Sequence, residues 1–168
     1  LLIFMILHMS VVVAVADTNL YSGEIVVASQ SESDRKDAIP DALIQVLQKL
    51  TGQREMPFTP AMDEALGNAD RLLLSYRYIN VDRVGPDGVD IVEIRLVAQF
   101  MQPDIDKVIQ QVGLPRWQQD RPAVQIWVVI DDGLSRYLKP LEFDYAWQSM
   151  EDVATMRGLP LSWPELDD

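Results

Sequence analysis

A tight turn between two apolar runs constrains the fold of this chain more than any other sequence feature. The turn is Gly85-Pro86-Asp87-Gly88, and these residue types favour a chain reversal. Residues 76–84 before it and residues 89–100 after it are rich in β-branched and aromatic side chains. Two such runs joined by a short turn predict an antiparallel hairpin. In the second run we expect one alternating set to face the core, namely Asp90, Val92, Ile94, Leu96 and Ala98.

Amphipathic segments flank the hairpin on both sides. A long helix is predicted up to Leu50, with its N-cap in the polar cluster at 29–33 and its stop at Gly52. Pro40 leaves two alternatives, since it either kinks this helix or begins it. Thr59-Pro60 predicts a short helix ending near Gly67, and residues 104–112 predict another. The apolar face of the long helix has three- and four-residue spacing, at Ile39, Leu43, Val46, Leu47 and Leu50.

Two further strands complete an α+β pattern. One is predicted at 20–28 and the other, which we expect to be buried, at 124–130. The first six elements then follow the order β-α-β-β-α-β of a ferredoxin-like unit. A helix at 143–157 and a strand from Leu159 extend this into the start of a β-α-β unit. We therefore predict an α+β domain over residues 17–115 and a partial α/β unit over residues 122–168, in a chain truncated at both ends.

The first 16 residues resemble a secretory leader. Fourteen of them are apolar, and the stretch ends Ala14-Val15-Ala16 before Asp17. Small residues at Ala14 and Ala16 are typical of a signal-peptide cleavage site, which predicts a mature N-terminus at Asp17. A retained membrane anchor and a buried core helix are the alternatives, although a spanning helix needs about 20 apolar residues. Cleavage places the protein in the periplasm or outside the cell.

Composition excludes several classes of function. The formal net charge is −12, which argues against binding to nucleic acid or to anionic lipid; contact with a membrane is expected only through the leader. The chain has no cysteine, and its single histidine, His8, lies in the leader. The mature chain therefore lacks the side chains of Ser-His and Cys-His catalysis and of zinc sites. We assign no catalytic residue, no metal and no cofactor.

Asp131 and Asp132 are adjacent carboxylates at the end of a predicted strand. Ligands of α/β sheets gather beyond the carboxyl ends of strands, and paired carboxylates suit Mg²⁺ or Ca²⁺. The sequence Asp131-Asp132-Gly133 is equally typical of an ordinary turn. We favour the turn interpretation, and the cation site stays as the alternative.

Arg116, Trp117 and Arg121 form a second candidate binding site. An exposed tryptophan beside two arginines is typical of a hot spot for a protein partner. In the alternative interpretation, Trp117 folds back on the core with an arginine stacked over its ring. We favour the packing interpretation for Trp117.

Several short motifs are spread along the chain after the leader. They are Ala42-Leu43, Val46-Leu47, Leu50-Thr51-Gly52, Tyr76-Arg77-Tyr78, Gly113-Leu114-Pro115-Arg116-Trp117, Arg121-Pro122, the strand with Trp127, and Arg157-Gly158-Leu159-Pro160-Leu161. Together these motifs resemble an uncharacterised family of exported bacterial proteins, domain of unknown function 2066. The resemblance implies a location in the cell envelope and a chain that continues beyond Asp168, and it supplies no catalytic residue.

Two functions remain open at this level. The first is a non-enzymatic binding or assembly module of the cell envelope, with an envelope protein as its partner. The second is a carboxylate- or divalent-metal-dependent hydrolase that uses Asp131 and Asp132. A concave pocket of converging carboxylates would favour the enzyme, and an exposed strand edge would favour the module.

Overall fold

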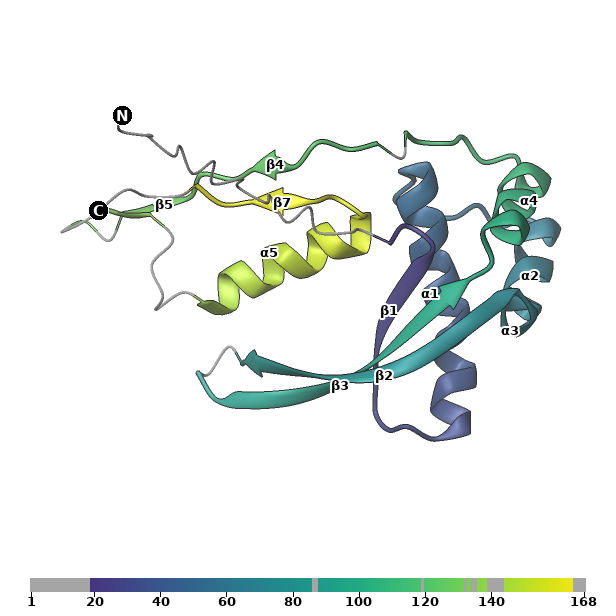
Figure 1. The fold of residues 1–168 in the computed structure, drawn as a ribbon, viewed down its shortest axis with the longest axis horizontal. Helices are drawn as coiled ribbons and strands as arrows, with labels where there is room; N and C mark the ends of the chain where they lie inside the picture. The colour runs from purple at the N-terminus through teal and green to yellow at the C-terminus, as the bar shows by residue number, and fades with distance from the viewer. Residues whose placement is uncertain are drawn as a thin grey trace, which may run out of the picture.

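The structure is a computed structural model that describes residues 19–85, 88–118, 120–131, 133, 136–138 and 144–164 (Figure 1). The predicted leader, with Ala14, Ala16 and Asp17, lies outside these residues. Of the helices in the described part, none is both long enough and apolar enough to cross a bilayer. The elements are β1 (Ser22–Val27), α1 (Glu32–Thr51), α2 (Pro60–Gly67), α3 (Ala69–Leu72), β2 (Leu73–Val84), β3 (Asp90–Phe100), α4 (Gln102–Val112), β4 (Val124–Gln125), β5 (Val129–Asp131), β6 (Arg136–Leu138), α5 (Asp144–Arg157) and β7 (Leu161–Ser162).

The main sheet is antiparallel, has three strands and follows the order β1-β3-β2. The predicted hairpin is confirmed as β2 and β3, which pair from Leu73↔Phe100 to Val84↔Asp90. The α+β class is also confirmed. The ferredoxin-like order is not observed among the described strands, because β4, the strand after α4, pairs in parallel with β7 instead of joining the main sheet.

Helix α1 follows the capping pattern that the sequence predicts. The Oγ of Ser31 accepts a hydrogen bond from the N–H of Asp34 at 3.1 Å, and Gly52 ends the helix with a left-handed φ of 72°. The helix begins at Glu32 and continues through Pro40, so the alternative in which Pro40 begins it is wrong. Because the helix has already made its first two turns before Pro40, packing along its apolar face outweighs the loss of one backbone donor.

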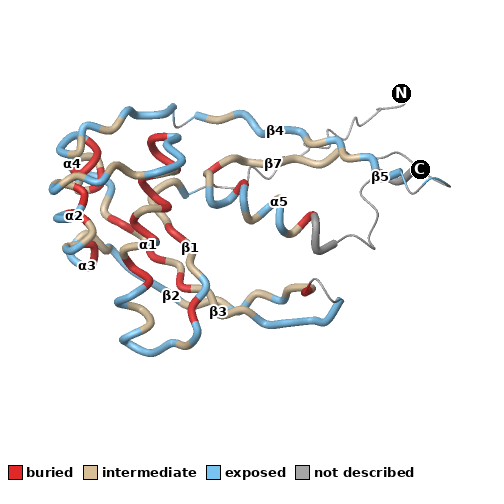
Figure 2. The backbone as a smooth tube through the Cα atoms, turned by 180° about the vertical axis from the view of Figure 1, so that it is seen from behind, coloured by how far each residue is buried: buried red, intermediate tan, exposed pale blue. Residues whose placement is uncertain are grey.

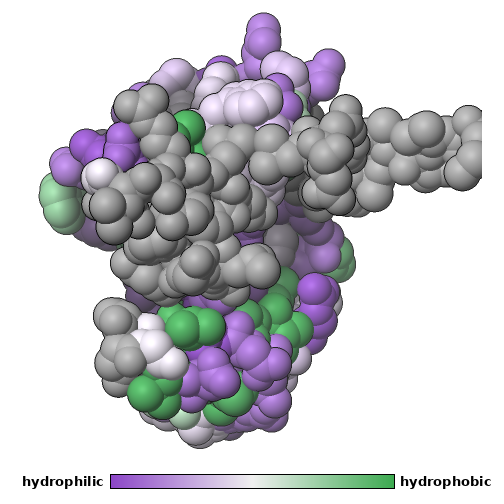
Figure 3. All heavy atoms as spheres, turned by 90° about the vertical axis from the view of Figure 1, so that its left-hand side faces the viewer, coloured by the Kyte–Doolittle hydropathy of each residue, from purple (hydrophilic) through white to green (hydrophobic). Residues whose placement is uncertain are grey.

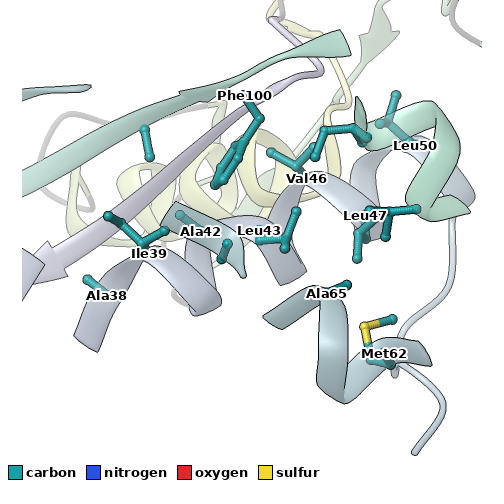
Figure 4. Close-up of a cluster of buried hydrophobic side chains, with 14 of the residues drawn as sticks. Ala38, Ile39, Ala42, Leu43, Val46, Leu47, Leu50, Met62, Ala65 and Phe100 are labelled. Carbon is teal, nitrogen blue, oxygen red and sulfur yellow. The ribbon is translucent and has the colours of Figure 1, made fainter. Parts of the chain in front are cut away.

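The core lies between α1 and one face of the main sheet, and Figure 2 shows the buried backbone concentrated on α1. Phe100 from β3 lies over α1 beside Ala42, Leu43 and Val46, while Leu47 points toward α2 (Figure 4). Leu96 and Ala98 are buried on the predicted core face of β3. Val92, on the same face, is 63% exposed because the distal part of the hairpin extends beyond α1 (Figure 1).

The C-terminal part consists of α5 and two small strand pairs. β4 and β7 form the parallel pair expected of a β-α-β unit, and β5 pairs with β6 as a short hairpin. The prediction of one buried strand at 124–130 is wrong. The segment is divided into β4 and β5, and Trp127 between them is 61% exposed. A ladder of two residue pairs, without a layer on both faces, leaves these apolar side chains in contact with solvent.

Candidate functional site

The outer edge of β1 is occupied by side chains of α1. Gln45 contacts both backbone groups of Glu24: its Oε1 accepts from the N–H at 2.5 Å, and its Nε2 donates to the carbonyl at 3.3 Å. The Nζ of Lys49 donates to the carbonyl of Ser22 at 2.8 Å. These contacts satisfy the outward carbonyl of Ser22 and both outward backbone groups of Glu24, which a further strand would need. Pairing of a fourth strand along this part of β1 is therefore disfavoured.

The outer edge of β2 is open. The bond from the N–H of Gly85 to the carbonyl of Val89, 2.8 Å long, sets the alternation of the β2–β3 ladder. In that alternation Tyr76, Tyr78, Asn80 and Asp82 direct their N–H and C=O groups away from β3. No hydrogen bond within the described residues reaches these outward groups. The two edges of the sheet therefore differ, since one is capped and the other can accept a strand.

Helix α5 is tied to the sheet face that lies opposite α1 by a cluster of partly buried charges. Arg95 of β3 lies 2.7 Å from a carboxylate oxygen of Glu93 and 3.3 Å from one of Asp152 on α5. Arg83 of β2 also forms an ion pair with Asp152. At the end of β2 the N–H of Val84 donates to the Oε1 of Gln148 at 3.3 Å. These bonds seat α5 over the outer face of the sheet.

Arg121 links the C-terminal ends of α1 and α5. Its guanidinium donates to the carbonyl of Lys49 at 2.5 Å and to the carbonyl of Gly158 at 2.8 Å. The same group stacks on the ring of Trp117, 4.1 Å from the ring centroid, and burial lowers the pKa of Arg121. Carbonyls at helix C-termini lack intrahelical donors, so an arginine there satisfies both ends at once. The structure thus brings Arg121 and Trp117 together in the arrangement expected for packing, with Trp117 still 41% exposed.

Arg116 makes a separate set of contacts. Its NH2 lies 3.0 Å from a carboxylate oxygen of Asp106 and donates to the hydroxyl of Tyr21 at 2.7 Å. The hydrogen bond with Asp106 raises the pKa of Arg116. Arg116 therefore anchors the loop after α4 to the start of the sheet and does not join the Arg121–Trp117 stack.

Asp131 is the last residue of β5 and is exposed. One of its carboxylate oxygens accepts the N–H of Gly133 at 2.9 Å, which is the bond of an Asx turn. This geometry favours the turn interpretation. Asp132 lies outside the described residues.

A cleft of about 530 Å³ lies between the outer face of the sheet and the α5–β7 segment. Its floor includes Ile79 and Val97, and Leu161 and Trp163 form part of the opposite wall. Lys49 lines it at the β1 edge, where the residue is only 4% exposed. The pKa of Lys49 is lowered to about 8, mainly by burial; Glu24 opposes this shift, and neighbouring Arg121 adds a smaller lowering effect. The cleft does not include Asp131.

We expect the stability of the protein to rise between pH 8 and pH 10.5 because of Lys49. The pKa of this amine is about 8 in the fold against 10.5 in the unfolded chain, so the unfolded chain holds more of its proton in this interval. The buried protonated amine lowers the free energy of unfolding by up to about 3 kcal/mol below pH 8, and this cost disappears as the pH rises to 10.5. Urea denaturation of wild type and Lys49→Met at pH 7.5, 9 and 10.5 measures it. The rise should be absent in the variant, and parallel pH profiles for the two proteins would contradict the assignment.

The residues of both edges and of the cleft were missed at the level of sequence. Gln45 and Lys49 lie within the amphipathic helix pattern, where polar residues are expected to face solvent, yet both are 4% exposed. Their spacing of four residues, on the same face as Ala42, is the one signal that could have placed them against a neighbouring element.

Comparison with known proteins identifies a family and no characterised relative. No curated protein and no solved structure matches the chain. The resemblance to domain of unknown function 2066 is wrong, since the family model that matches is a different one. Its match extends from residue 14 to residue 118, which includes the three-stranded sheet and helices α1–α4 and leaves out Arg121 and α5. Because the match covers more than half of the chain, the protein belongs to the family described as Domain of unknown function (DUF8605).

Proposed function

We propose that the protein is a non-enzymatic binding module of the cell envelope, which holds an extended segment of a partner protein against the outer edge of β2. The observation that carries this proposal is the contrast between the two sheet edges. Side chains of α1 cap β1, whereas β2 presents unpaired N–H and C=O groups from Tyr76 to Asp82 within the described structure. An open edge of this kind recognises a partner by adding its strand to the sheet.

The surroundings of this edge suit an apolar, extended partner segment. Tyr76 is 45% exposed and is held by Arg35, which stacks on its ring at 4.7 Å and donates to its hydroxyl at 3.0 Å. Val92 and Ile91 of the neighbouring strand are 63% and 45% exposed. Apolar side chains lie among hydrophilic ones at the end of the hairpin, in the lower part of Figure 3. Such side chains supply pockets for alternate residues of an added strand.

The location in the envelope rests on the leader. The apolar run up to Ala16 supports export to the periplasm or the outside of the cell, and an exported module would meet envelope proteins. The acidic charge of −12 supports a protein partner over nucleic acid. The hydrolase alternative has less support, because the carboxylate of Asp131 is engaged in a turn and does not line the cleft.

Affinity capture from envelope extract tests the proposal with three versions of the full chain: wild type, Asn80→Pro and Asn80→Thr. Asn80 pairs with Ile94 at a position where its N–H points away from β3, so proline removes an outward donor and keeps the ladder. Threonine changes the same side chain and keeps the donor. We expect a partner that wild type and Asn80→Thr retain and that Asn80→Pro loses, with similar thermal transitions for all three chains. Equal capture by the proline variant would contradict strand addition at β2.

A further inference from the structure

The cleft between the sheet and the α5–β7 segment has an apolar surface on both sides. Ile79 and Val97 come from the outer face of the sheet, on the neighbouring strands β2 and β3. Leu159, Leu161 and Trp163 line it from the segment after α5. Its volume of about 530 Å³ falls within the range of roughly 300–1,000 Å³ that is typical of small-molecule sites. The cleft therefore has the size and the walls for the apolar part of a ligand.

Two cations that line the cleft have no carboxylate partner among the residues that the structure describes. Lys49 uses one of its three ammonium donors on the carbonyl of Ser22. Arg77 lies opposite Val97 on the outer face of the sheet. Within the described part of the chain, no carboxylate lies within ion-pair distance of either side chain. A buried ammonium is unfavourable without a close counter-charge, and Glu24, which acts on Lys49 beyond ion-pair distance, offsets this only in part.

The two carboxylates that line the same cleft are already engaged. Glu24 lies 3.7 Å from the guanidinium of Arg95, and an oxygen of Glu151 accepts the indole N–H of Trp163 at 3.0 Å. Lys49 and Arg77, in contrast, have no carboxylate within ion-pair distance among the described residues. An anion with an apolar body can therefore bind these two cations and pack against the apolar walls.

We propose that this cleft binds a small amphipathic carboxylate, such as a medium-chain fatty acid. Lys49 and Arg77 contact its carboxylate, and Ile79, Val97 and Leu161 pack against its alkyl chain. Arginine suits a carboxylate because its planar guanidinium group can donate two parallel hydrogen bonds to the two carboxylate oxygens. This site is separate from the outer edge of β2, so it stands or fails independently of strand addition there.

Calorimetric titration of the full chain with octanoate at pH 7 and 0.15 M salt tests the proposal, with 1-octanol as the uncharged ligand of the same chain length. We expect one site per chain with a Kd below about 100 µM for octanoate, which is within reach of a ligand of this size. Octanol should bind at least about tenfold more weakly. Arg77→Gln should weaken octanoate binding at least about tenfold, because it removes a charge from an exposed position that the fold does not need. Arg71→Gln, at an exposed arginine of α3 outside the cleft, is the matched control and should bind like wild type.

Three results would overturn the proposal. They are no detectable binding of octanoate at concentrations up to about 1 mM, equal affinity for octanoate and octanol, and unchanged octanoate affinity in Arg77→Gln. Lys49→Met adds a second readout, since the thermal transition shows whether this variant is folded. A folded Lys49→Met that binds octanoate as tightly as wild type would also overturn the assignment. Tighter binding of a peptide with a free apolar C-terminus than of octanoate would replace the fatty acid with a protein ligand and contradict the proposal.

Discussion

Replacing Gly23 by alanine should destabilise the protein by at least ~3 kcal/mol, at the upper end of what overpacking costs in a protein core. Gly23 is buried on the core face of β1, and a Cβ there would lie 2.3 Å from the carbonyl oxygen of Ala42 and 2.8 Å from its Cα. These are backbone atoms of α1, so no side-chain rotation can relieve the overlap. Strand β1 would have to move away from the helix, and the bonds of Gln45 and Lys49 to the β1 edge would break with it. Urea denaturation of the variant measures the loss.

Gly67→Ala is the matched control for this change. Gly67 ends α2, and a Cβ at that position meets no atom within 4 Å. Alanine there should leave stability unchanged or raise it by up to about 1 kcal/mol, because it reduces the freedom of the unfolded chain. A loss of less than about 1 kcal/mol for Gly23→Ala would show that β1 and α1 are not held as close as the structure has them.

Leu47→Asp should abolish cooperative folding. Leu47 is fully buried in α1, and its side chain points toward Met62 and Ala65 of α2 (Figure 4). An unpaired carboxylate at this position costs several kcal/mol, which is about the whole stability of a small domain. Differential scanning calorimetry checks this, and the variant should show no heat-absorption peak.

The same substitution at an exposed leucine separates burial from the chemical change itself. Leu74 lies at the start of β2 and is 60% exposed, so Leu74→Asp should shift the melting temperature by only a few degrees. A cooperative transition of Leu47→Asp within about 5 °C of wild type would show that the buried face of α1 is misplaced.

Local structure in this protein follows from local chemistry. Ser31 and Gly52 delimit α1, Thr59 caps α2 through its hydroxyl, and Gly113 ends α4 with a left-handed φ of 76°. These signals act over three or four residues, so the sequence alone predicts them. The hairpin of β2 and β3 is equally local, because one short turn joins its strands.

The predictions that failed concern partners far apart in the chain. A strand after α4 could have joined the main sheet or paired with a later strand, and both choices agree with its residue pattern. The capping of Ser22 and Glu24 by α1 disfavours the first choice at the β1 edge, and the sequence does not show this capping. The exposure of Trp127 has the same origin, since burial depends on which layers cover a strand and not on its own apolar content.

The same contrast between local features and contacts of distant residues holds for the candidate sites. The sequence by itself determined that the chain is acidic, free of cysteine and α+β in class, that a turn follows Asp131, and that Trp117 has arginines nearby. Only the tertiary structure decided that Arg121 joins two helix ends, that one sheet edge is capped while the other is open, and that Lys49 and Arg77 share a cleft. The reason is physical: caps and turns depend on neighbours within one turn of chain, whereas unpaired edges and unpaired charges depend on everything packed around them.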